Sequence, residues 1–221
     1  SNDIRRIWHL NRPSRIYTSF ASAWHPDGRQ VLFSSDIEDR YGLYRLDPET
    51  GSHERLSMPS HDLLGEFSVI PDADAVFYKA NDPDPSEQQV FRIAADGGEA
   101  RRITSLAGTN NGVPSPDGSR LAILYSADAS PPELYLAHTG ERELRRLTTS
   151  PPEEFRQRSW TSGRYVSFPS RADDFTLHAR ILEPAVLEAG RRHPVVLGPV
   201  YSNTVRNRWS GRYSAVQQLL V

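Results

Sequence analysis

The sequence predicts a mainly β fold built from a repeated unit, and three observations support this prediction. A proline-containing turn recurs at a fixed spacing, because Pro26, Pro71 and Pro116 are each 45 residues apart. Two segments rich in β-branched, aromatic and aliphatic residues follow each turn, as is typical of strands. A glycine-containing turn and a short Arg-apolar segment then end each unit. Self-similarity at this period indicates one supersecondary unit that occurs three times.

The first two parts of each unit are a turn and an apolar strand. The turns read HPDG, IPDA and SPDG at residues 25–28, 70–73 and 115–118. Proline presets φ at the second position and glycine accepts the left-handed fourth position, so Ala73 is expected to be mildly strained or to turn differently. The strands that follow have apolar side chains on both faces, at residues 31–33, 76–78 and 121–123. Both faces of each sheet are therefore expected to be covered.

The second half of each unit supplies two further strands joined by a hairpin. The next strand of each unit lies at residues 43–46, 90–93 and 134–137. The hairpin turns lie at residues 47–51, 96–98 and 139–140, and the last strands at 55–56, 102–104 and 146–148. A β-propeller blade has four strands, two covered faces and a period of roughly 40 to 50 residues, and the units are interpreted as such blades. A β-sandwich is disfavoured, because its strands have one polar face and no fixed long period.

The blades define the first predicted domain, residues 1–157. Residues 5–8, which read RRIW, occupy the position of the last strand of an earlier blade. The domain is thus predicted to be a partial propeller, with one last strand and three blades. Since propellers need about four to eight blades to close, the sequence is expected to be a piece of a longer polypeptide.

Composition limits the classes of partner and cofactor. Lys and Arg number 26 and Asp and Glu 28, a net charge of -2 that argues against nucleic acid or an anionic membrane as partner. The longest apolar runs are far below the roughly 20 residues of a membrane span. There is no cysteine, and the seven histidines lack metal-ligand spacing. No cofactor or metal is expected, and the bacterial periplasm is preferred over the cytoplasm as compartment.

Residues 158–221 break the repeat and are predicted to be a linker and the start of a second domain. The period recurs once more at residues 162–168, but no further blade strands follow. Strands are expected instead at residues 177–182 and 193–197, the second one continuously apolar. A helix is expected to open at Gly211, with Tyr213, Val216 and Leu220 on one stripe. Trp24, Trp160 and Trp209 are expected to pack in a core or at the domain junction.

Two motifs in this segment carry a resemblance to a known family. Residues 168–177 read FPSRADDFTL, with Pro184 beyond them, and residues 194–201 read PVVLGPVY. This resembles the start of the α/β-hydrolase domain of the prolyl oligopeptidase family, most closely its dipeptidyl peptidase IV branch. Asp174 stands where that family usually has glycine, and residues 202–203 replace its usual Gly-Pro pair. The Pro-Asp-Gly turns also match the family's propeller, so the resemblance covers essentially the whole chain.

The resemblance implies that the parent protein is a serine peptidase. Such an enzyme needs a serine on a Gly-x-Ser-x-Gly elbow, followed by Asp and His. This sequence has no such elbow, and the family places its triad after the position of Val221, so the fragment alone is expected to be inactive. By its place in the motif, Tyr201 corresponds to the family's tyrosine whose O–H supports the oxyanion. The alternative is a strand-end tyrosine with its ring in the core.

The function implied by the resemblance is hydrolysis of short peptides near their amino terminus, with the propeller limiting access. Short peptides are the expected partners, and a homodimer is allowed. The pair Glu153 and Glu154 is interpreted as a solvated loop, because the family's paired glutamates lie in a different context. Two alternatives stay open: a non-enzymatic TolB-like propeller that binds proteins, and a hydrolase fold without a triad.

Overall fold

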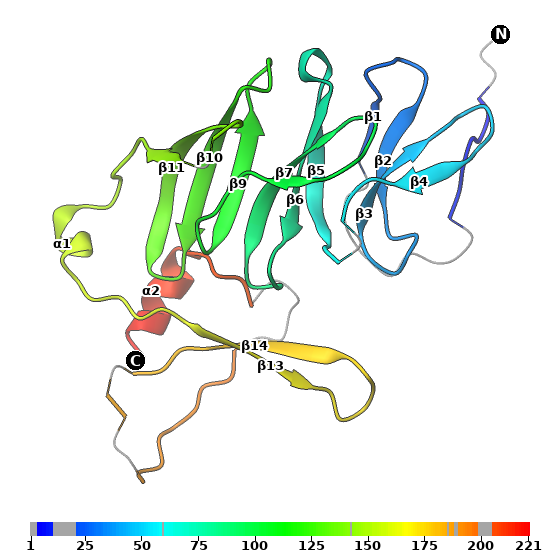
Figure 1. Ribbon diagram of the computed structural model, residues 1–221. Helices are drawn as coiled ribbons and strands as arrows, with labels where there is room; N and C mark the ends of the chain where they lie inside the picture. The colour runs from blue at the N-terminus through cyan, green and yellow to red at the C-terminus, as the bar shows by residue number, and fades with distance from the viewer. Residues whose placement is uncertain are drawn as a thin grey trace.

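The three blades predicted from the sequence are present as three successive antiparallel units. The structure is a computed structural model that describes residues 4–10, 21–58, 60–141, 143–184, 186–187, 190–198 and 205–221. The units lie side by side from the blue to the green part of the chain (Figure 1). The first unit contains β1 (Ser22–Trp24), β2 (Val31–Ser35), β3 (Gly42–Leu46) and β4 (His53–Arg55). The second contains β5 (Leu63–Ile70), β6 (Ala75–Asn81), β7 (Gln88–Ala94) and β8 (Arg101–Arg102). The third contains β9 (Thr109–Pro114), β10 (Arg120–Ala127), β11 (Ser130–His138) and β12 (Leu144–Arg146).

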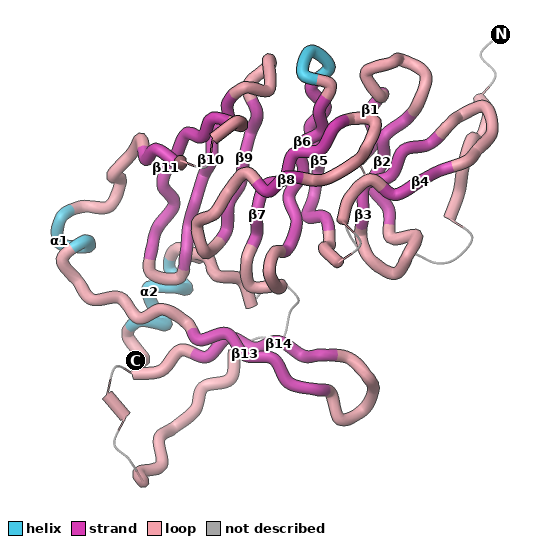
Figure 2. The backbone as a smooth tube through the Cα atoms, in the orientation of Figure 1, coloured by secondary structure: helices cyan, strands magenta, loops and turns pink. Residues whose placement is uncertain are grey.

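Strand pairing follows chain order within each unit. The first unit is a separate sheet with the order β1-β2-β3-β4. The second and third units share one eight-stranded sheet, because Gln88 of β7 pairs in parallel with Thr109 of β9. Strands dominate the described backbone, which also contains one short 3-10 helix just before β6 and two α-helices near the carboxyl end (Figure 2). The prediction of propeller-like, four-stranded units is therefore confirmed.

The Pro-Asp-Gly turns have the geometry that the sequence predicts. Gly28 and Gly118 both have φ of 68°, and each donates its N–H to the residue three positions earlier, at 2.9 and 2.8 Å. In the second unit, Ala73 ends a short 3-10 helix (Pro71–Ala73), and Asp74 takes the left-handed conformation with φ of 43°. The turn is thus longer by one residue, which relieves Ala73 of a backbone conformation that its Cβ disfavours.

Gly118 lies against the neighbouring unit, whereas Gly28 has open space around it, which gives a testable difference between the two glycines. Replacing Gly28 or Gly118 with alanine strains the left-handed backbone by about 1 kcal/mol in each case. A Cβ at Gly118 would also lie 2.8 Å from the Cβ of Ala73, whereas one at Gly28 would have nothing within 4 Å. We expect Gly118→Ala to lower the free energy of unfolding clearly more than Gly28→Ala in urea titrations. Equal losses would contradict the proposed packing of the two turns.

Side chains of the central strands alternate between two cores. Val76 and Tyr78 belong to the cluster formed with the first unit, and Ala75 and Phe77 belong to the cluster formed with the third. Both faces of the second unit are therefore buried, as predicted. The third unit differs, because alternate positions of β10 are exposed, including Leu124 at 48%. No described strand packs against that outer face, so the prediction of two covered faces is wrong for this unit.

The amino end of the first domain departs from prediction in two details. Residues 4–10 form no strand, because their backbone forms no ladder with a described strand. Trp8 instead packs on the first unit, with its ring 5.0 Å from that of Phe33. Trp24 is 65% exposed, so its predicted burial is wrong. The predicted division of the chain at residues 157 and 158 stays a prediction.

The carboxyl-terminal segment leaves the blade pattern. A short helix, α1 (Glu153–Arg156), precedes the strands β13 (Arg164–Pro169) and β14 (Thr176–Ile181), which pair only with each other. This hairpin forms no ladder with a blade strand among the described residues, and the helix α2 (Arg212–Gln218) lies next to it, below the third unit in this view (Figure 1). The helix predicted from Gly211 is therefore confirmed, although its apolar stripe is exposed. Residues 193–197 form no strand and are exposed, contrary to prediction, because no described strand is adjacent to hydrogen-bond with them.

Candidate functional site

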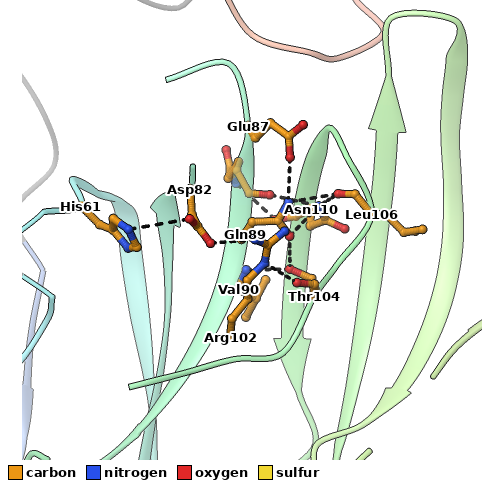
Figure 3. A network of polar contacts seen from close by, with 10 residues as sticks. His61, Asp82, Glu87, Gln89, Val90, Arg102, Thr104, Leu106 and Asn110 are labelled. Atoms are coloured by element: carbon orange, nitrogen blue, oxygen red, sulfur yellow. Dashed lines mark hydrogen bonds and ion pairs between the residues drawn. The ribbon is translucent and has the colours of Figure 1, made fainter. Parts of the chain in front are cut away.

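A buried polar network fixes the crossover from the second unit to the third. Gln89, which is fully buried, accepts hydrogen bonds from the hydroxyl of Thr104 at 2.6 Å and from the amide of Asn110 at 3.2 Å. Its own amide donates to the carbonyl of Leu106 at 3.0 Å. Asn110 donates to that same carbonyl at 2.9 Å. Figure 3 shows these groups converging between β7 and the segment that leads into β9. The network therefore sets the position of β9 relative to β7.

An ionic chain continues from this network towards the loop that precedes β5. The guanidinium of Arg102 donates from Nε to the carbonyl of Thr104 at 2.7 Å and from Nη1 to Asp82 at 2.9 Å. On its other side, Asp82 lies 3.7 Å from the imidazole Nε2 of His61 (Figure 3). These contacts tie the loop after β6 to the crossover, so that the ends of β6 and β9 are held together.

The network predicts a measurable loss of stability when one member is removed. Gln89→Leu keeps the side-chain size but leaves the Thr104 hydroxyl without its acceptor, and a buried group left unpaired costs about 1–3 kcal/mol. We expect the double variant Gln89→Leu/Thr104→Val to lose less stability than the sum of the two single variants, because it removes both partners. Chemical denaturation of the four proteins measures this coupling. Strict additivity would show that the network is not energetically connected.

A group of cationic and amide side chains lies at the end of β6, close to this crossover. Lys79 donates to the side-chain oxygen of Asn111 at 3.2 Å, and Arg206 donates to that of Asn81 at 2.6 Å. Lys79 and Asn81 are two residues apart on one strand and so share a face. Burial, reinforced by the charge of Arg206, lowers the pKa of Lys79 below its usual value. Burial and the neighbouring Arg208 likewise lower the pKa of Arg206.

A second group joins the hairpin to the third unit. Asp128, which is 1% exposed, forms an ion pair at 3.0 Å with Arg180 of β14. Its other carboxylate oxygen accepts the phenol O–H of Tyr165 at 2.7 Å and the N–H of Gly163 at 2.8 Å. Burial, together with this carboxylate, raises the pKa of Tyr165, so its phenol remains a donor. The backbone N–H of Asp128 donates to Asn207 at 2.9 Å.

The segment around Asn207 and the helix α2 completes this junction. Asn207 donates its N–H to the carbonyl of Ser86 at 2.7 Å, and its own carbonyl accepts the hydroxyl of Thr109 at 3.1 Å. Trp160 and Trp209 pack together with Phe155, with ring centroids 4.3 to 5.5 Å apart, so the predicted packing of these two tryptophans is confirmed. The carboxyl-terminal segment is therefore bound to the end of the second and third units by polar and aromatic contacts.

A cavity of about 230 Å³ lies beside β11 and α1. Its one buried carboxylate, Glu133, accepts from the N–H of Ser150 at 2.7 Å and from Arg146 at 3.0 Å, and also from the hydroxyl of Thr148. These partners occupy the carboxylate, so it is not a free binding group. We therefore place the candidate site at the group of cationic and amide side chains at the end of β6 and at the contacts between Asp128 and the hairpin.

The predicted site residues lie in different places. Tyr201 falls outside the described residues, so its role as an oxyanion donor stays a prediction. Glu153 and Glu154 are exposed and form the start of α1 rather than a loop. The described residues contain no group of three side chains suited to a metal ion. In the part of the chain that the structure describes, the helices lack the length and apolar character that crossing a bilayer requires.

Sequence reasoning did not identify Lys79, Arg206 or Asp128 as site residues. One signal was available for Lys79, because it is the single lysine in a chain whose lysines and arginines together number 26. Asp128 and Arg180 are 52 residues apart in the sequence. Nothing in the local pattern of either residue indicates that they meet.

Comparisons with known proteins identify the family to which the blades belong. An uncharacterized protein of Agrobacterium fabrum (strain C58) is 27% identical over 112 residues, which are 50% of this chain and 37% of that protein. The crystal structure of dipeptidyl peptidase 4 from Porphyromonas gingivalis superposes with a TM-score of 0.66 at 20% identity. That match covers 82% of this chain and 26% of the solved one, so this chain spans only part of both proteins. Residues 2–132, more than half of the chain, match the family described as the dipeptidyl peptidase IV N-terminal region. The chain therefore belongs to that family, as a propeller fragment related to the dipeptidyl peptidases.

Proposed function

We propose that the complete polypeptide is a serine-type dipeptidyl or oligopeptidyl peptidase, of which this chain supplies part of the propeller and the start of the catalytic domain. The family match of residues 2–132 is the observation that carries this proposal. A serine nucleophile, its Asp and its His belong to the part of the parent protein beyond Val221. The chain itself contributes Tyr201 as donor to the developing oxyanion. Such a donor acts only as charge develops on the substrate oxygen, and therefore raises kcat.

The course of the chain after Phe168 supports a second domain rather than a further blade. The strands β13 and β14 pair with each other and with no blade strand among the described residues. A propeller used only for binding, as in the TolB-like alternative, would continue the four-stranded repeat through this region. Residues 205–209 return to the end of β6 and β9, so the segment that follows the hairpin lies against the propeller.

This arrangement suggests how the propeller limits the substrates. A cavity enclosed between two domains accepts only ligands that fit its entrance. We infer that short peptides enter this space and are cleaved near their amino terminus, whereas folded proteins are excluded.

Hydrolysis of chromogenic dipeptides by the complete polypeptide tests the proposal. We expect turnover of Gly-Pro- and Ala-Ala-p-nitroanilide, and its irreversible loss after treatment with a fluorophosphonate, which reacts with an activated serine. Activity that survives the fluorophosphonate would overturn the assignment of a serine nucleophile. No turnover of any Pro- or Ala-containing member of the series would overturn the peptidase proposal and favour a binding propeller.

A further inference from the structure

The cationic group at the end of β6 contains more positive charge than its ion pairs require. Neither Lys79 nor Arg206 has a carboxylate within ion-pair distance among the residues that the structure describes. The nearest acids influence them only at longer range, Glu66 for Lys79 and Asp62 for Arg206. Two partly buried cations thus act at one face of β6, Lys79 from the strand itself and Arg206 through its bond to Asn81, and the charge of Arg206 lowers the pKa of Lys79. Such an arrangement is costly unless an anion binds there.

The surrounding amides supply further donors. The side-chain oxygen of Asn111 already accepts from Lys79 and, at 2.9 Å, from the amide of Gln88, while that of Asn81 accepts from Arg206. Their NH₂ groups donate to no described residue and stay available. Asn111 is exposed, so the group is open to solvent. The ammonium, the guanidinium and the free NH₂ groups of the two amides are all donors, the complement of an oxygen anion.

The group has an excess of positive charge. Arg208 adds to the charge near Arg206, and of the two acids that act on the group, Asp62 already pairs with Arg40 at 3.2 Å. This excess suits an anion, and a carboxylate is the anion that a peptide substrate offers. The position also fits, because this group lies where residues 205–209 contact the blades, on the side of the propeller that faces the proposed catalytic domain.

We propose that Lys79 and Arg206, with the amides of Asn81 and Asn111, form a binding site for a carboxylate of the peptide substrate. This inference rests on the proposed function for its substrate class. The carboxylate can come from the carboxyl terminus of a short peptide or from an acidic side chain. In the first case the site selects peptides by the distance between the cleaved bond and the carboxyl terminus. In the second case it selects peptides with an acidic residue after the cleaved bond.

Paired substrates in the complete polypeptide test the site. Ala-Pro-Ala with a free carboxyl terminus is compared with its amide, and Ala-Pro-Asp-amide with Ala-Pro-Asn-amide. We expect one acid to have a KM roughly tenfold lower than its neutral partner, the size of one charge-assisted hydrogen bond. In Lys79→Gln this ratio should fall to about one. Arg101→Gln removes the same charge from an exposed position on β8 and should keep the wild-type ratio.

The outcomes separate the site from the peptidase proposal. Turnover of Ala-Pro-p-nitroanilide together with acid-to-amide ratios near one, or ratios that Lys79→Gln leaves intact, would overturn the site alone. If the polypeptide hydrolyses nothing, calorimetric titration with the same peptide pairs decides the matter. A preference for the acid that depends on Lys79 would then support the site, and equal affinity for both members would overturn it.

Discussion

Replacing Tyr201 with phenylalanine in the complete polypeptide is expected to lower kcat for a dipeptidyl p-nitroanilide by roughly 10²–10³-fold, the range measured for loss of one oxyanion donor. The phenylalanine keeps the ring and removes only the O–H. Since this donor would act on charge that develops in the transition state, KM should change little. Steady-state kinetics measure both values.

A second tyrosine provides the matched control. Tyr213 lies on α2 and is 65% exposed, so Tyr213→Phe should keep kcat within about twofold, as surface substitutions usually do. A wild-type kcat in Tyr201→Phe would show that the tyrosine is a strand-end residue with a structural role. A rise in KM at constant kcat would show that it binds the substrate without acting on the oxyanion.

Replacing Asp128 with asparagine is expected to detach the hairpin β13–β14 from the third unit. The buried Asp128 balances Arg180, whose side chain is only 13% exposed, and it also accepts from Tyr165 and Gly163. Asparagine would leave the guanidinium without a counter-charge, and breaking a buried pair in this way costs about 3–5 kcal/mol. Hydrogen exchange should show a loss of protection at residues 164–181.

The same hairpin contains a matched exposed pair. Arg164 and Glu183 lie 3.1 Å apart with side chains 56% and 43% exposed. Glu183→Gln removes the same charge as Asp128→Asn but should cost under about 1 kcal/mol, because exposed ion pairs contribute little. Equal exchange rates in the two variants would contradict the claim that Asp128 anchors the hairpin. An effect spread over all three units would show instead that Asp128 supports the whole fold.

The blades could be predicted from the sequence because their signals are local. Each turn needs a proline and a residue that accepts a left-handed backbone, and both requirements appear in the sequence at a fixed period. The departure at Ala73 was also predicted, because alanine disfavours the left-handed conformation, and in the structure Asp74 adopts it instead. Burial of both faces follows from the apolar residues at 76–78, which alternate between two cores.

The candidate site could not be predicted in the same way, because its members come from distant parts of the chain. Lys79 and Arg206 meet only when residues 205–209 contact the end of β6, and Asp128 meets Arg180 only when the hairpin packs on the third unit. Two of the failed predictions, the covered outer face of β10 and the strand at residues 193–197, share one cause. The outer face of β10 and residues 193–197 have apolar sequences whose burial needs neighbouring strands, and no described strand lies beside them.

The central claim is that this propeller serves a peptidase that acts on the amino end of short peptides. Its most direct test compares kcat/KM for Ala-Pro-p-nitroanilide and for the same substrate with an acetylated amino terminus, using the complete polypeptide. We expect turnover of the free substrate and at least about a hundredfold loss on acetylation, because a site built to bind a polar group rejects an analogue that lacks it. Equal turnover of both substrates would contradict the dipeptidyl assignment, and no turnover of either would contradict the peptidase itself.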